Sequence, residues 1–334
     1  MRLGIVGTGF IAAVHAACAA RSSRVELIAV SGIRGRARPD SIPGLDPAVR
    51  LATIGELLAM DDVEAVLVCS RTVDHVKHAT AVLGAGKHLL LEKPGAIGTG
   101  GQTRIREAAA AQPGVVARVA YHRRHDARFR ELARLIAEGA IGRPFAIQME
   151  SRENFPPGTD DLAAGGFLMD VGVHDFDTAR WLLGADPQTV AVASQRALYM
   201  DADLDQAYVT IELDGAMAFT HLARTNTVGM DIRCEVLGED GSVVFDRSRR
   251  RGEITLLTAG SDAVFAADCR DFFAQAYARQ MDDFESACRG QAAPNATLED
   301  DRWAVATAVA ARAAVTREGP LPVGPDWPWP DGQP

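Results

Sequence analysis

An aspartate and a histidine four residues apart, Asp170 and His174, are the residues best spaced to do chemistry. They follow Gly165 and Gly166, where a helix is expected to begin, and residues four apart share one face of a helix. A histidine exchanges protons near neutral pH, and a neighbouring carboxylate fixes its tautomer and raises its basicity. The pair therefore indicates a general base with its orienting acid. A buried histidine satisfied by a helix-stabilising aspartate is the alternative that this segment leaves open.

A glycine-rich turn follows the first apolar run of the chain. Strand, turn and helix are expected over residues 2–6, 7–12 and 13–20. Gly7 permits the tight turn, Gly9 lets the backbone approach a pyrophosphate, and the small Ala12 lets the helix pack on the strand. A second apolar run over residues 25–31 completes a βαβ unit, so the sequence predicts a dinucleotide site; a glycine turn without a ligand is the alternative.

The end of the second apolar run has no acidic residue. NAD sites usually place Asp or Glu there for the ribose hydroxyls, whereas NADP sites carry small and basic residues for the 2′-phosphate. This chain has Ser31, and then Arg34 and Arg36. We therefore expect NADP(H) to be preferred over NAD(H), with Arg34 or Arg36 binding the phosphate through its guanidinium. A solvated basic loop is the alternative.

A lysine follows the apolar run over residues 89–92. The run ends in Glu92-Lys93-Pro94, which is typical of a central strand that delivers a side chain to the carboxyl edge of a parallel sheet, where ligands bind. A lysine there could stabilise negative charge on a substrate oxygen, and a cis bond before Pro94 would direct it. Taken alone, Lys93 also fits an exposed charge at a strand end.

Together these segments resemble the Gfo/Idh/MocA family of oxidoreductases. The likeness rests on the glycine turn, AGKHLLLEKP at 85–94, YHRRHDARF at 121–129 and GGFLMDVGVHDFDTARWLLG at 165–184. It covers essentially the whole chain in the family's order and is strongest to the inositol and sugar dehydrogenases. It implies that Lys93, Asp170 and His174 are the catalytic groups.

The residues expected to hold the ligands follow from the same motifs. Cofactor contacts are expected from Gly7, Gly9, Phe10, Ile11, Ser31, Arg34, Arg36, Ser70, His75, Glu92 and Lys93. The segment holding Ser70 and His75 lacks the Thr-Pro that many members show. Polyols need several convergent donors and acceptors, and His122, Arg123 and Asn154 are expected to supply them. No metal is expected, because lysine can polarise the oxygen.

Length and composition limit the class of protein. A chain of 334 residues with 47% hydrophobic residues fits two domains. The net charge of −9 argues against a nucleic-acid partner. No apolar run or leader indicates a membrane segment or secretion, so a cytoplasmic protein is expected. Five scattered cysteines indicate neither a disulfide framework nor a zinc site.

The expected fold is α/β in two domains. Residues 1–120 predict a Rossmann domain with a doubly wound parallel sheet, and residues 121–334 an α+β domain with a large open-faced antiparallel sheet. Family members associate through such a face, so a homodimer or homotetramer is expected. The tail with Trp327 and Trp329 either docks on a neighbour or is loose.

The implied activity is reversible hydride transfer between NADP(H) and a secondary alcohol or ketone of a cyclitol or sugar. A nucleotide-sugar ketoreductase is one alternative. An NADP-binding sensor of the same fold without catalysis is another. Retention of Lys93, Asp170 and His174 favours an enzyme, since a sensor needs no proton relay.

Overall fold

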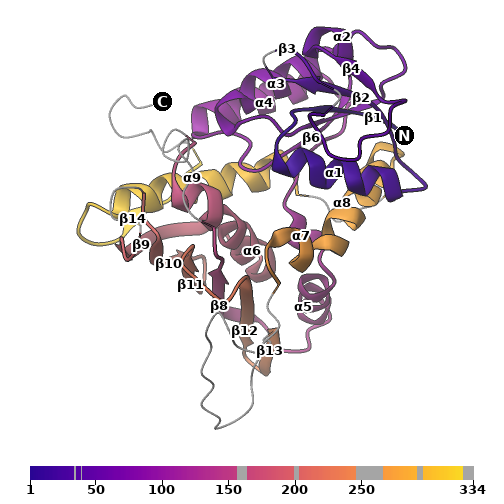
Figure 1. The fold of residues 1–334 in the computed structure, drawn as a ribbon. Coiled ribbons are helices and arrows are strands. Elements are labelled where there is room, and N and C mark those ends of the chain that lie inside the picture. Colours follow the sequence, from indigo (N-terminus) through magenta and orange to yellow (C-terminus); the bar gives the residue numbers. More distant parts are fainter. Residues whose placement is uncertain are drawn as a thin grey trace. The chain divides into compact units, whose positions relative to one another are not determined.

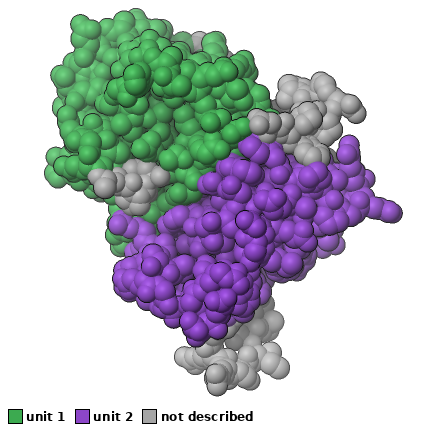
Figure 2. Space-filling model, turned by 180° about the vertical axis from the view of Figure 1, so that it is seen from behind, with its two compact units in different colours: residues 1–126, 275–302 green, residues 127–274, 303–334 purple. Residues whose placement is uncertain are grey.

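The computed structural model describes residues 1–33, 35–38, 40–155, 164–198, 203–245, 266–291 and 296–325. These residues belong to two compact units, which Figure 2 shows in different colours. Unit 1 comprises residues 1–126 and 275–302, and unit 2 comprises residues 127–274 and 303–334. Arg34 and the two tail tryptophans, Trp327 and Trp329, lie outside the described residues.

Unit 1 contains a seven-stranded sheet in the order β3-β2-β1-β5-β6-β7, with β4 paired to β2. Its strands are β1 (Arg2–Val6), β2 (Glu26–Gly32), β3 (Gly35–Arg36), β4 (Arg50–Ala52), β5 (Ala65–Val68), β6 (His88–Leu91) and β7 (Ala117–Val119). Every pair is parallel except β2 with β3. All four residues of β5 are buried, as expected for a strand covered on both faces.

The direction of the crossovers decides on which face of this sheet each helix lies. The helices are α1 (Phe10–Arg21), α2 (Ile54–Leu58), α3 (Thr72–Gly84) and α4 (Thr99–Ala110). Right-handed crossovers place α1 on one face of the sheet and α3 with α4 on the other (Figure 1). The strand order reverses at β1, which has β2 on one side and β5 on the other. This topology confirms the predicted Rossmann fold. Doubly wound folds bind ligands at the carboxyl ends of the strands where the order reverses.

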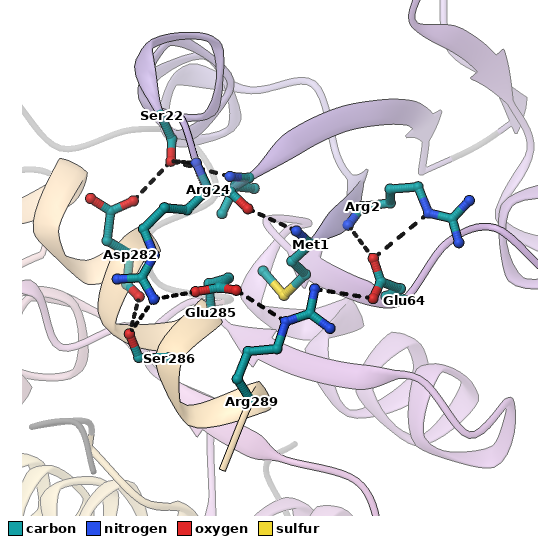
Figure 3. A network of polar contacts seen from close by, with 10 residues as sticks. Met1, Arg2, Ser22, Arg24, Glu64, Asp282, Glu285, Ser286 and Arg289 are labelled. Carbon is teal, nitrogen blue, oxygen red and sulfur yellow. Dashed lines mark hydrogen bonds and ion pairs between the residues drawn. The ribbon is translucent and has the colours of Figure 1, made fainter. Parts of the chain in front are cut away.

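Helix α8 (Ala274–Cys288) brings a distant part of the chain into unit 1. Its Met281 and Phe284 are fully buried in the core that contains Leu3 and Ile5. Polar contacts hold the same helix at the start of the sheet, as Figure 3 shows. They are Ser22 Oγ to Asp282 Oδ1 at 2.8 Å, Arg24 Nη2 to Glu285 Oε2 at 2.5 Å and to Ser286 Oγ at 2.8 Å, and Arg289 Nη2 to Glu64 Oε1 at 3.4 Å. The expected division into residues 1–120 and 121–334 follows chain order and therefore differs from the compact units.

Unit 2 contains a seven-stranded sheet in the order β13-β12-β8-β11-β10-β9-β14. Its strands are β8 (Pro144–Arg152), β9 (Pro187–Gln195), β10 (Gln206–Leu213), β11 (Ala216–Ala223), β12 (Asp231–Gly238), β13 (Gly241–Phe245) and β14 (Leu321–Pro322). The expected sheet was wholly antiparallel, and this is wrong for one pair, since β8 and β11 run parallel. The long connection from β8 allows this, because it includes helix α6 (Val173–Leu183).

The two faces of the unit 2 sheet differ as the alternation of residues predicts. Along β10, Val209, Ile211 and Leu213 are buried, while Tyr208 is 46% exposed. The buried face packs against α6, which contacts β8 and β11. Helix α5 (Ala127–Ala137) contacts β13. No helix of the described residues has the length and apolar character needed to cross a membrane.

Candidate active site

The glycine turn of unit 1 has the shape of an anion site. Gly7 has a left-handed φ of +119°, and an added Cβ there would collide with the carbonyl oxygen of Cys69. Gly9 precedes α1, where no side chain caps the helix, and an added Cβ would meet no atom within 4 Å. Helix α1 therefore begins with a glycine beside open space, which suits the approach of a pyrophosphate to the helix start. Phe10 is 47% exposed, and Ile11 is partly buried.

The end of β2 carries a small residue, and the next strand carries an arginine. Ser31 is fully buried, and its carbonyl oxygen accepts from Gly7 N at 2.9 Å. Arg36 donates to Leu51 O and pairs with the carboxylate of Glu56. Glu56 also completes a capping box with Thr53, and the hydrogen bonds from Thr53, with the charge of Arg36, lower the pKa of Glu56. An NAD site usually carries Asp or Glu at the end of this strand, and here that position is Ser31.

Lys93 follows β6 at the carboxyl edge of the sheet, and its bond to Pro94 is cis. The neighbouring Glu92 is 5% exposed and uses both carboxylate oxygens within unit 1. His15 Nε2 donates to Oε1 at 2.7 Å, and Lys93 N donates to Oε2 at 3.1 Å. Glu92 thus fixes the backbone of Lys93. The sequence led us to expect a cofactor contact from Glu92 and did not indicate this second role.

His75 connects the segment after β5 to the segment after β6. Its ring is 2% exposed, with Nδ1 2.8 Å from Pro94 O and Nε2 2.9 Å from Ser70 O. Burial lowers the pKa of His75, while these hydrogen bonds act in the opposite direction. A neutral ring has one N–H and donates to one of the two carbonyls. Both ring nitrogens of His75 therefore face backbone carbonyls, one of which belongs to Pro94, next to Lys93. The expected contact of His75 with the cofactor stays a prediction.

His122 and Arg123 lie in a short 3₁₀ helix, η1 (His122–His125). Both are buried, and the His122 ring lies 4.8 Å from the ring of Tyr277 on α8. Burial holds the pKa of His122 well below its usual value, and the charges of Arg123 and Lys93 act in the same direction. The fold of unit 1 thus brings the predicted substrate residues His122 and Arg123 into the electrostatic neighbourhood of Lys93.

Asp170 and His174 lie at the start of α6 in unit 2, but not on one regular helix. Asp170 belongs to a π-helical turn, η2 (Leu168–Gly172), and His174 is the second residue of α6. The expected single α-helix is therefore a π turn that runs into α6, and the shared face of the two residues stays a prediction. Such turns are frequent at functional sites.

A buried carboxylate next to His174 anchors α6 to the sheet. Asp175 is fully buried, accepts from Ser151 Oγ of β8 at 2.7 Å and also accepts from Thr220 Oγ1 of β11. Thr178 Oγ1 donates to the carbonyl oxygen of His174 at 2.7 Å. The sequence offered no signal for Asp175 beyond its place next to His174, because its partners come from distant strands.

The remaining predicted groups are also placed. Asn154 is exposed and forms an isolated antiparallel bridge with Thr225 in unit 2. In the part of the chain that the structure describes, no group of three or more His, Cys, Asp or Glu side chains is arranged to hold a metal ion. Unit 1 therefore holds the glycine turn, Lys93, His122 and Arg123, and unit 2 holds Asp170, His174 and Asn154.

Comparison with known proteins defines the class. Residues 1–121 match the model of an oxidoreductase family with an NAD-binding Rossmann fold. Residues 129–244 match the model of the GFO/IDH/MocA C-terminal domain. The chain therefore belongs to the Gfo/Idh/MocA family of oxidoreductases.

Individual relatives narrow the likeness to polyol and sugar enzymes. The chain is 27% identical over 325 residues to the myo-inositol 2-dehydrogenase of Thermotoga maritima, covering 94% of this chain and 96% of that protein. It is 32% identical over 330 residues to the 1,5-anhydro-D-fructose reductase of Ensifer adhaerens, with coverage of 94% and 96%. The fold also matches the crystal structure of the Lactobacillus casei myo-inositol dehydrogenase in complex with NAD(H) and myo-inositol. The TM-score is 0.83 at 21% identity, over 97% of each chain.

Proposed function

We propose that the protein is a nicotinamide-dependent dehydrogenase or reductase that interconverts a secondary alcohol and a ketone of a cyclitol or sugar. The observation that carries this proposal lies in unit 1. A glycine turn that opens a helix follows strand β1, and a lysine follows strand β6 of the same sheet. Both lie at the carboxyl edge of the parallel strands. The relatives named above act, by their names, on inositols and on an anhydro sugar.

The proposed chemistry divides the work among three side chains. When bound, the nicotinamide cofactor supplies or accepts the hydride. His174 takes the hydroxyl proton, and Asp170 orients its ring and stabilises its charged form. Lys93 donates to the same oxygen and lowers the cost of alkoxide character. His122, Arg123 and Asn154 bind other hydroxyls of the substrate; His122 does so as a neutral ring, because its pKa is depressed.

The direct test is nicotinamide absorbance in both directions. Inositols and other polyols would be offered with oxidised cofactor, and 1,5-anhydro-D-fructose with reduced cofactor. Lys93→Ala and His174→Ala should each lower kcat by about a hundredfold or more, and His174→Ala should do so with little change in cofactor affinity. Lys77→Ala, which changes an exposed lysine on α3, is the matched control and should stay near the wild-type rate. Cofactor binding without turnover in either direction would favour the sensor instead.

NADP(H) is proposed as the preferred cofactor. Ser31 stands at the end of β2 where an NAD site would carry an acid, and Arg36 lies in the next strand. Its pair with Glu56 has side chains 56% and 46% exposed, and exposed pairs contribute only about 0–1 kcal/mol. Exchange of Glu56 for a phosphate would therefore cost little. Arg34 is proposed to share this role.

The matched pair for this proposal is Arg36→Ala and Arg50→Ala. Arg50 also donates to one backbone carbonyl, Ile28 O at 3.3 Å, and to one carboxylate, Asp62 Oδ2 at 2.7 Å. Arg36→Ala should raise the Kd for NADPH by about tenfold and leave that for NADH unchanged. Arg50→Ala should change neither. Tighter binding of NADH than NADPH by the wild type would remove the preference.

The open face of the unit 2 sheet is proposed to join copies of the chain into a homodimer or homotetramer. Tyr208, Met217 and Phe219 are 46%, 47% and 38% exposed on it. Tyr208 stacks on His221 at 4.3 Å between ring centres, and on Phe219 at 5.8 Å. Contiguous exposed apolar area of this kind is typical of protein interfaces.

A further inference from the structure

A carboxylate from far along the chain contacts the segment that carries Lys93. Asp301 lies in the first turn of α9 (Leu298–Ala314), and its Oδ2 accepts from Gly95 N at 3.0 Å. Tyr121 Oη donates to Oδ1 at 2.7 Å, and Gln102 Nε2 donates to Oδ2. Asp301 and Gln102 are 0% exposed and Tyr121 is 1% exposed. All four residues belong to unit 1.

The contact with Gly95 completes a set of backbone restraints around the lysine. Lys93 N donates to Glu92 and Gly95 N donates to Asp301, and between them Pro94 O lies 2.8 Å from His75 Nδ1. The residue at 95 must be small for this to occur, because an added Cβ would collide with Asp301 Oδ2. The backbone of Gly95 is not left-handed, so space and not conformation requires glycine.

The environment of Asp301 fits a charged group that fixes neighbouring backbone. A buried carboxylate is costly unless donors and nearby positive potential offset its desolvation. Here three donors and the start of a long helix do so. The same carboxylate binds Tyr121, which directly precedes His122. It thus links the segment that carries Lys93 to the segment that carries the predicted substrate-binding residue His122.

We infer that Asp301 is a positioning residue that acts through Lys93, by holding the strand exit so that the lysine amine meets the reacting oxygen. The inference rests on the catalytic role proposed for Lys93. Small displacements of a reacting group are expensive: about 1 Å can cost a hundredfold in rate. Loss of this restraint should therefore slow turnover without removing cofactor binding.

The test compares Asp301→Ala with Tyr121→Phe, each in the wild type and in Lys93→Ala. Tyr121→Phe removes a donor from the same carboxylate but leaves the Gly95 contact. Asp301→Ala should lower kcat by about tenfold, with the KM for cofactor within about twofold of the wild type. Tyr121→Phe should stay within about twofold in kcat. In Lys93→Ala, Asp301→Ala should cause no further loss, because the group it positions is gone. Single-turnover rates at high enzyme concentration keep the slowest variants measurable.

Two outcomes would overturn the inference, and they are distinguishable. An equal loss from Asp301→Ala in both backgrounds would assign the residue a purely structural role while Lys93 keeps its own. A normal kcat for Lys93→Ala alone would remove the proposed role of the lysine, and with it this inference. If Asp301→Ala does not fold, Gly95→Ala displaces the carboxylate without removing its charge. Additive losses from Gly95→Ala and Lys93→Ala would then refute the positioning role.

Discussion

The buried, neutral imidazole of His122 should make unit 1 less stable as the pH falls. Its pKa is well below the ordinary value in the folded protein and returns to about 6.5 on unfolding. The unfolded state therefore binds more protons below about pH 6.5, and stability is lost as the pH falls from there toward the folded-state pKa. His75, whose pKa is also lowered by burial, acts in the same direction.

The magnitude follows from linkage. One proton bound only by the unfolded state changes the free energy of unfolding by up to about 1.4 kcal/mol per pH unit. His122→Phe keeps a ring against Tyr277 but cannot titrate, so it should reduce the pH slope by up to about that amount. His221→Phe is the control in unit 2. Its ring also stacks on a tyrosine but is only partly buried, so it should change the slope less.

Urea denaturation between about pH 7.5 and pH 5 would measure these slopes. Trp181 and Trp303 belong to unit 2, and the described part of unit 1 contains no tryptophan. All four tryptophans of the chain lie outside the residue ranges of unit 1, so tryptophan fluorescence does not arise from that unit, while circular dichroism follows both units. Comparing the two signals separates the transitions. An unchanged slope for unit 1 in His122→Phe would refute the reasoning, because it would mean that the ring is charged or hydrated in the folded protein.

Other predictions concern the glycine turn, the anchor of α6 and the open sheet. Gly7→Ala should lower the free energy of unfolding by about 1–3 kcal/mol, because the residue has a left-handed φ and its added Cβ would collide with Cys69 O. Gly9→Ala should keep the melting temperature but raise the Kd for cofactor by about tenfold in a titration. Asp175→Ala should cost about 2–5 kcal/mol in urea denaturation, because two buried hydroxyls lose their acceptor. Glu212→Ala is the control: it removes an exposed carboxylate that accepts from Thr189 Oγ1 and should lower the free energy of unfolding by under about 0.5 kcal/mol. A loss as large as that of Asp175→Ala would contradict the argument from burial. Tyr208→Asp should shift the mass in light scattering to a smaller species, and an unchanged mass would exclude this part of the face as the interface.

Local patterns in the sequence were sufficient for the Rossmann half of the fold and for the two-faced strands of unit 2. The order of strand, glycine turn and helix at the N-terminus repeats in the structure, as does the alternation along β10. Both patterns arise from the period of the backbone, which a short window of sequence reports. The same motifs identified Lys93 and His174 as candidate groups, and their shared action on one substrate stays a prediction.

Partners that are distant in the sequence were decided only by the tertiary structure. Nothing in the pattern around residue 301 indicates that its carboxylate meets Gly95, nor that α8 packs on the core of the first sheet. The parallel pairing of β8 with β11 and the π turn at Asp170 also depend on packing between segments. A local pattern specifies which face of an element is apolar, but many segments could cover that face. The choice among them is made by the packing and hydrogen bonding of the whole chain.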